Sequence, residues 1–275
     1  MNKVSVSRTV AVALAVLVLP ALLLASHSWG SYHWARTSNP FTLKVGNNLT
    51  ADWSSAFSTS VQNWNNSTVL QLSPIAGTSN KRCSMVSGTV QVCNGKYGNN
   101  GWLGLASINL ASGTNHITQG SAKMNDTYFS TPTYNNANER LHVMCQEIGH
   151  TFGLDHQDTS GASLNTCMDY FSNTGPNAAS TLSTTPNAHD YDELVTIYAH
   201  LDSTTTIGAR AAAVAGRSEV TNDPNTWGML ISQSANGRSS TYENVNNDGS
   251  KTVTHVYWTA EAADRCASCD HRYDR

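Results

Sequence analysis

The first part of the chain after residue 40 shows apolar positions with two different periods. Residues 41–45 alternate between apolar and polar side chains, which predicts a strand, and residues 68–72 predict a second one. Between them, residues 48–66 place apolar side chains at helical spacing and are expected to form an amphipathic helix. The apolar residues of that helix are Trp53, Phe57, Val61 and Trp64. A strand–helix–strand order favours parallel pairing through a right-handed crossover.

The middle of the chain continues this mixture. Residues 103–110 and 116–124 are expected to be strands, and residues 138–151 to be a helix that buries Leu141, Met144 and Ile148. A last helix is predicted over residues 191–201, with Asn187 or Asp190 as its N-cap. Helices and strands in this order indicate a fold of the α+β class.

The last part of the chain has a different pattern. Residues 203–225 are rich in Ala, Gly and Thr and are interpreted as a linker, and residues 226–275 as a small β-rich C-terminal region. Its expected strands are residues 227–233, 239–244 and 251–258. Asn-Gly and Asp-Gly pairs at residues 236–237 and 248–249 are typical of the hairpin turns between them. We expect this region to form a small antiparallel sheet that packs against the main domain, because about 50 residues seldom fold alone. The sequence does not indicate its function.

One run within the predicted helix of residues 138–151 and the turn after it carries candidate chemistry. It reads Cys-Gln-Glu-Ile-Gly-His-Thr-Phe-Gly-Leu-Asp-His and contains Gln146, Glu147, His150, Gly153 and His156. These residues reproduce the spacing H-E-x-x-H-x-x-G-x-x-H of a zinc-protease helix, except that glutamine replaces the first histidine.

Helix geometry explains the spacing. A helix turns about 100° per residue, so Gln146 and His150 lie on one face and can bind the same ion. Glu147 stands beside that ion, where a general base takes a proton from metal-bound water. Gly153 permits the sharp turn that brings His156 back as third ligand. Three protein ligands leave a fourth position for water, as in catalytic zinc sites, and one Zn²⁺ is the predicted cofactor.

Met168 follows His156 by twelve residues in the stretch Asn-Thr-Cys-Met-Asp-Tyr. On Glu147, His150, Gly153, His156 and Met168 the chain resembles the metzincin zinc metalloproteases, of the matrixin or astacin type. The resemblance implies a metzincin-like catalytic domain over residues 29–202, with a twisted mixed β-sheet, a metal-site helix and a Met-turn under the metal. It also implies that one of the strands expected at residues 103–110 and 116–124 lies at the upper sheet edge and pairs with an extended peptide substrate.

The glutamine leaves three interpretations open. Gln146 is a direct ligand, another residue replaces it, or the site is inactive; an amide oxygen is a weaker zinc donor than imidazole. Cys145 faces away from His150 on the helix, and His142 lies one turn too early to be a direct ligand. By the resemblance, Tyr170 approaches the metal and stabilises the reaction intermediate; the alternative is a packed core ring.

Composition limits the partners. Residues 1–28 are interpreted as a secretory signal peptide, with Lys3 and Arg8 before an apolar run that Pro20 interrupts. The protein is therefore expected to be secreted, with no membrane anchor after signal removal. Only 13% of residues are charged and the net charge is -3, which offers no basic stripe for nucleic acid. The expected partner is a protein or peptide substrate, and a monomer is expected.

Six cysteines in an oxidising compartment indicate disulfide bonds. Cys83 and Cys93 bracket a short segment and are expected to pair. Cys145 precedes Gln146 and Cys167 precedes Met168, so a bond between them would fasten the metal helix to the Met-turn. The C-x-x-C pair near the end of the chain, residues 266 and 269, is expected to form a terminal disulfide or an intermolecular link.

These features together predict a secreted zinc-dependent endopeptidase, in which Glu147 is the general base and Gln146, His150 and His156 are the metal ligands. The alternative is a catalytically weak or inactive protein that keeps the cleft to bind peptides. Intact Glu147 favours the enzyme, because a binding protein has no chemical need for a carboxylate there, whereas Gln146 favours the alternative.

Overall fold

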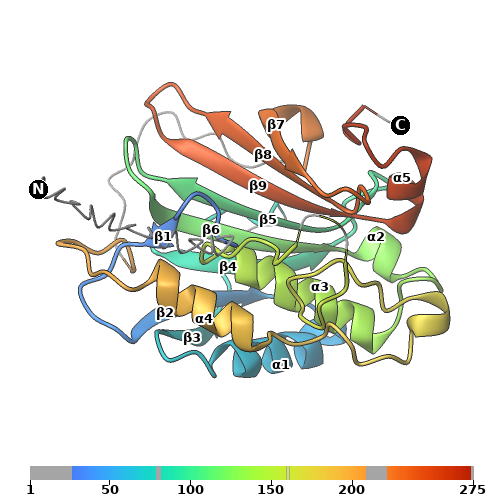
Figure 1. The fold of residues 1–275 in the computed structure, drawn as a ribbon, viewed down its shortest axis with the longest axis horizontal. Helices are drawn as coiled ribbons and strands as arrows, with labels where there is room; N and C mark the ends of the chain where they lie inside the picture. The colour runs from blue at the N-terminus through green and yellow to red at the C-terminus, as the bar shows by residue number, and fades with distance from the viewer. Residues whose placement is uncertain (1–26, 79–81, 159, 161, 209–221, 274–275) are drawn as a thin grey trace, which may run out of the picture.

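The computed structural model describes residues 27–273 except residues 79–81, 159, 161 and 209–221 (Figure 1). The predicted signal peptide therefore lies outside the described residues up to residue 26, as does most of the predicted linker. Within the described part, one nine-stranded sheet carries helices on the face that also holds the candidate site (Figure 1).

The strand order in this sheet is β3-β2-β4-β6-β5-β9-β8-β7, and β1 pairs with β6. The pairs among β1, β2, β3, β4 and β6 are parallel, and every pair from β6 through β5 to β7 is antiparallel. The strands are β1 His33–Trp34, β2 Phe41–Asn48, β3 Leu70–Ala76, β4 Thr89–Gly95, β5 Trp102–Leu110, β6 His116–Asn125, β7 Met229–Gln233, β8 Ser239–Val245 and β9 Lys251–Trp258. This confirms the predicted α+β class with a mixed sheet.

The helices bury the aromatic and aliphatic residues that the sequence pattern marked, except that Leu141, which was expected to be buried, is only half-buried. Trp53 and Trp64, on either end of the first amphipathic segment, are fully buried in the core beneath the sheet. The α-helices are α1 Ser54–Trp64, α2 Asp126–Phe129, α3 Ala137–His150, α4 Ala188–Ile197 and α5 Ala260–Arg265. Short 3-10 turns lie at Ala51–Trp53, Gly175–Asn177 and Pro224–Thr226.

Two of the expected elements have different bounds for local reasons. The last predicted helix begins at Ala188 because Asn187 and Asp190 form a reciprocal capping box at its start. The second strand extends to Ala76, since β3 pairs in parallel with β2 from Leu70 onwards.

The C-terminal strands do not form a sheet of their own. β9 pairs antiparallel along β5, from Lys251 opposite Leu110 to Trp258 opposite Trp102, and β8 and β7 follow outwards. Figure 1 shows these strands as the upper continuation of the main sheet. The expectation of a substrate-binding edge at residues 103–110 or 116–124 is therefore wrong for this structure, because β5 lies between β6 and β9 and β6 lies between β4 and β5.

All three disulfide bonds fall where the sequence suggested. Cys83 pairs with Cys93 and Cys145 with Cys167, which confirms both expected bridges. Cys266 pairs with Cys269 within the chain, so the terminal disulfide, and not an intermolecular link, is present.

Candidate metal centre

Helix α3 is held tightly against the elements below it. Asn136 caps its start, since its side chain accepts from the backbone N–H of Glu139. At the other end Gly149 has no room for a side chain, because a Cβ there would lie 2.7 Å from Met168 Sδ and 2.8 Å from the Trp64 ring. The sequence therefore places a glycine, one residue before His150, where the helix contacts residues 167–169, which we call the Met168 segment.

The turn after α3 brings the next part of the motif back. Gly153 has a φ of +98°, and a Cβ there would lie 2.0 Å from the Tyr32 carbonyl oxygen, so both backbone and space require glycine. The Leu154 carbonyl accepts from His150 Nδ1 at 2.8 Å, which leaves Nε2 as the free nitrogen of that ring. The backbone N–H of Trp29 donates to the Gly153 carbonyl, so the start of the described chain lines this turn.

Three histidines meet beyond that turn. Potential ligand atoms of His150, His156 and His255 all lie within 4.8 Å of one another. His150 and His255 are 0% exposed to solvent, and His156 is 4% exposed. Within the described residues, neither His150 Nε2 nor His156 Nε2 has a hydrogen-bond partner. Such buried nitrogens are costly unless something binds them.

Glu147 completes this group. Its Oε2 lies 3.1 Å from His255 Nδ1, and both residues are fully buried. Burial raises the pKa of Glu147 well above its ordinary value, and burial together with the neighbouring His150 and His156 lowers that of His255. Both shifts favour the uncharged forms, a protonated carboxyl beside a neutral imidazole. Gly104 on β5 makes room for this carboxyl, because a Cβ there would lie 2.5 Å from Glu147 Oε1.

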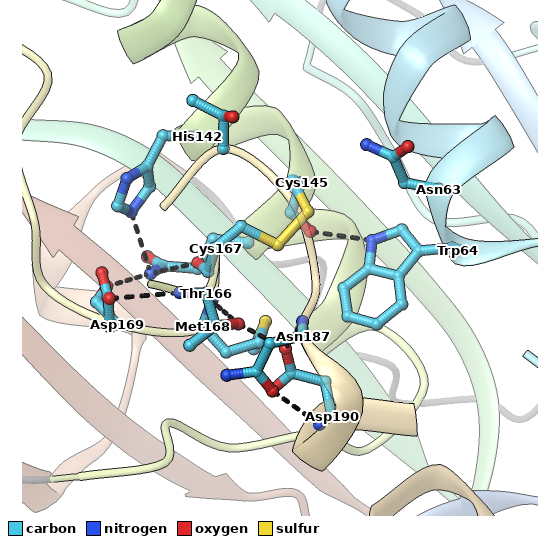
Figure 2. The surroundings of a disulfide bond; sticks show 12 residues. Asn63, Trp64, His142, Cys145, Thr166, Cys167, Met168, Asp169, Asn187 and Asp190 are labelled. Carbon is cyan, nitrogen blue, oxygen red and sulfur yellow. Dashed lines mark hydrogen bonds between the residues drawn. A yellow bond between two sulfur atoms is a disulfide. The ribbon is translucent and has the colours of Figure 1, made fainter. Parts of the chain in front are cut away.

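Gln146 is held by the backbone of the Met168 segment. Its Nε2 donates to the Cys167 carbonyl at 2.9 Å and to the Asp169 carbonyl at 2.7 Å. The Cys145–Cys167 disulfide joins the same two segments, and Figure 2 shows it beside Met168 and Trp64. Among the described residues, Gln146 Oε1 has no hydrogen-bond partner. Its amide nitrogen therefore holds the backbone of residues 167–169 in place.

The remaining predicted residues surround the histidines. The Tyr170 ring stacks on His156 with 4.5 Å between ring centroids, and burial raises the pKa of its hydroxyl. His142 is fully buried, with Nδ1 3.3 Å from Asn173 Oδ1, which agrees with its exclusion as a direct ligand. Asp155 lies 3.4 Å from His156 Nδ1, an arrangement that directs His156 Nε2 towards the other histidines.

The side chains fit a divalent transition-metal ion. Two buried imidazole nitrogens without partners, a third imidazole and a carboxyl group form the nitrogen-rich donor set that zinc prefers. His150, His156 and His255 would hold the ion, and its charge would favour the ionised form of Glu147. The buried position of Glu147 is then explained, since a cation offsets the cost of burying a carboxylate.

Sequence reasoning missed two of these residues. His255 lies in the predicted strand of residues 251–258. The sequence feature that could have marked it as a site residue is an imidazole among β-branched and aromatic side chains. Trp29 stacks face to face on His150, with 4.8 Å between ring centroids and 1° between planes. The sequence placed Trp29 only at the expected start of the mature chain.

Comparisons with known proteins add little to this picture. No family model matches the chain, and no curated protein matches it. Among solved structures, the chain is similar to one titled "Structure of myroilysin", at 14% identity, over 64% of this chain and 98% of that one. The TM-score is 0.34, so the likeness carries no argument about the site or its activity. Among the described residues, no helix has both the length and the apolar character needed to cross a bilayer.

Proposed function

We propose that this protein is a secreted zinc-dependent endopeptidase whose metal is held by His150, His156 and His255, with Glu147 as the general base. The observation that carries the proposal is the pair of buried, unpartnered Nε2 atoms of His150 and His156 beside the Glu147 carboxyl. In this assignment His255 replaces the first histidine of the motif. Gln146, proposed from the sequence as a ligand, instead orients the Met168 segment, which serves as the Met-turn.

Each residue has a chemical role. Bound zinc lowers the pKa of a water molecule and polarises a peptide carbonyl. Glu147 takes a proton at its carboxylate and returns it to the leaving amine, and the absence of a side chain at Gly104 leaves the space that this carboxyl occupies. Tyr170, stacked on His156, is placed to donate its hydroxyl proton to a developing oxyanion, because burial keeps it protonated.

The geometry adds one condition. β9 occupies the edge of β5 that an extended peptide would need, and its His255 is bonded to the general base. Glu147, His150 and His255 are fully buried, so no substrate reaches them in this arrangement. We therefore assign the structure to a closed form in which His255 is the third ligand. Hydrolysis requires β9 to separate from β5, which also withdraws His255, so that His150 and His156 keep the metal and the vacated position passes to water and substrate.

The test is hydrolysis of an unfolded generic protein by the full chain, with and without a chelator. We expect chelator-sensitive cleavage that Glu147→Gln abolishes, because this change removes the base and keeps the shape. Asp192→Asn, on the exposed side of α4, is the control and should keep wild-type activity. Chelator-resistant cleavage, or full activity in Glu147→Gln, would contradict the proposal.

A second candidate function is favoured by the closed arrangement itself. A three-histidine centre that is sealed by β9 suits a metal site that holds the fold together, and the protein would then bind peptides or other partners without cleaving them. This protein would contain zinc, lose stability with chelator and show no cleavage under any condition. The same assay, run with metal analysis, separates the two functions.

A further inference from the structure

A second group of metal-binding side chains lies away from the centre described above. It consists of His33, His116, His200 and Asp202, which we call the second histidine cluster. His33 is on β1 and pairs in register with His116 at the start of β6. His200 and Asp202 follow the end of α4. Three segments far apart in the sequence therefore meet at this point.

Asp202 is oriented so that one oxygen faces the histidines. Its Oδ2 accepts from the Arg36 backbone N–H at 3.1 Å and from Arg36 Nη1 at 3.0 Å. Its Oδ1 lies 3.5 Å from His33 Nε2, 3.2 Å from His116 Nε2 and 3.7 Å from His200 Nε2. Arg36 thus fixes the carboxylate and leaves Oδ1 to the imidazoles.

The tautomer of His33 is set by its other nitrogen. His33 Nδ1 lies 2.8 Å from the Ser31 carbonyl, which can only accept, so Nδ1 carries the hydrogen. In the neutral ring Nε2 then presents a lone pair to Asp202 Oδ1 and to His200 Nε2, which is 3.2 Å away. These lone pairs are met either by an Nε2–H of a neighbouring imidazole or by a metal ion.

The distances also fit a metal ion. His33 Nε2, His200 Nε2 and Asp202 Oδ1 form a triangle with sides of 3.2, 3.5 and 3.7 Å. Zinc bonds of about 2.0–2.1 Å in a tetrahedron place neighbouring ligand atoms about 3.3 Å apart. The triangle therefore has the size of one face of a zinc tetrahedron, with room for a fourth ligand.

We propose that His33, His200 and Asp202 bind a second divalent metal ion, zinc, with His116 or water in the fourth position. Imidazole and carboxylate donors suit zinc, and the site lies outside the motif of residues 146–156. The ion joins β1 and β6 to the end of α4, so its role is structural. This proposal does not depend on the proposed peptidase activity.

The test is metal analysis of the full chain after equilibration with zinc and removal of excess. We expect two equivalents in the wild type, one in His200→Ala and one in the double variant His116→Ala/His200→Ala. His200 is suited to this because its side chain is 54% exposed, so its loss leaves the core intact. His189→Ala, which removes an exposed histidine of α4, is the control and should keep two equivalents.

The outcomes separate the two metal sites. If the centre at His150 holds no zinc, the wild type contains one equivalent and His200→Ala contains none. If only the centre at His150 binds, the wild type contains one equivalent and His200→Ala keeps it, which overturns this proposal. A zinc-induced rise in the melting temperature that is smaller in His200→Ala than in His189→Ala is the second expected result. Equal rises with equal zinc contents would also overturn it.

Discussion

His255 brings an imidazole from the last strand to a motif more than a hundred residues earlier in the chain. Its contacts with Glu147 and with the His150 and His156 rings come entirely from the pairing of β9 with β5. The alternating pattern of residues 251–258 predicted a strand, but nothing local in it says which strand lies beside it. The histidines and the glutamate of the helix motif could be predicted, because helix spacing fixes their relative positions. The position of His255 could not, because it depends on long-range strand pairing.

The ligand assignment leads to opposite effects of two substitutions. His255→Ala should reduce zinc at the centre to below half an equivalent, because it removes a buried imidazole ligand. Gln146→Ala should keep the zinc but lower the free energy of unfolding by about 1–3 kcal/mol, since two backbone carbonyls lose their buried donor. Metal analysis and denaturant unfolding of both variants check this. Loss of zinc in Gln146→Ala with retention in His255→Ala would restore glutamine as the ligand.

Buried histidine also predicts a pH dependence of stability. Burial lowers the pKa of His142 from 6.5 to about 4, so between these values the unfolded chain binds more protons than the folded one. The contribution of His142 is therefore complete above about pH 6.5 and is lost as the pH falls towards 4. The difference corresponds to about 3 kcal/mol.

Unfolding of chelator-treated protein at pH 7 and pH 4.5 measures this loss. His142→Asn removes the titrating group and should show a smaller decrease than the wild type. Identical decreases in the two proteins would show that His142 does not contribute.

At the scale of elements, helix α3 and the segment after Cys167 act as one unit. The disulfide, the Gln146 hydrogen bonds and the contact of Gly149 with Met168 all join the same two pieces of chain (Figure 2). Neighbouring positions in the sequence made the Cys145–Cys167 pair predictable, because both cysteines precede residues of the expected centre. The hydrogen bonds of Gln146 were not predictable, since the motif suggested a ligand at that position.

Removing this bridge should be costly. Cys145→Ala/Cys167→Ala opens a loop with a sequence separation of 22 and should lower the free energy of unfolding by about 3 kcal/mol. Cys266→Ala/Cys269→Ala opens a separation of only 3 and is the matched control, with a smaller expected loss. Denaturant midpoints of both variants give the comparison. An equal loss in the two would mean that loop length does not set the effect.

For the whole molecule, the decisive feature is that the C-terminal strands complete the main sheet. The turns and strands of residues 226–258 could be predicted, because hairpin signals are local. Their attachment to β5 could not, since register and partner depend on burial of faces that are distant in the sequence. A small β-region of its own would have left the centre accessible, and the extended sheet closes it.

A disulfide across the closing pair tests whether opening is needed. Ser107 and Thr254 are opposite each other on β5 and β9, with their hydroxyl oxygens 3.1 Å apart. Ser107→Cys/Thr254→Cys should form a bond at this position and abolish hydrolysis of protein substrates, and a reductant that does not bind zinc should restore it. Ser107→Cys, given the same reductant, is the control. Full activity of the oxidised double variant would mean that substrate enters without separation of β9.

The position of His255 near the end of the chain also sets an order of events during biosynthesis. A chain made from its N-terminus presents His150 and His156 about a hundred residues before the third imidazole leaves the ribosome. Metal capture by all three rings must therefore wait until β9 has been made. A nonsense mutation between codons 157 and 254 would release a polypeptide that has the complete helix motif yet lacks this ligand.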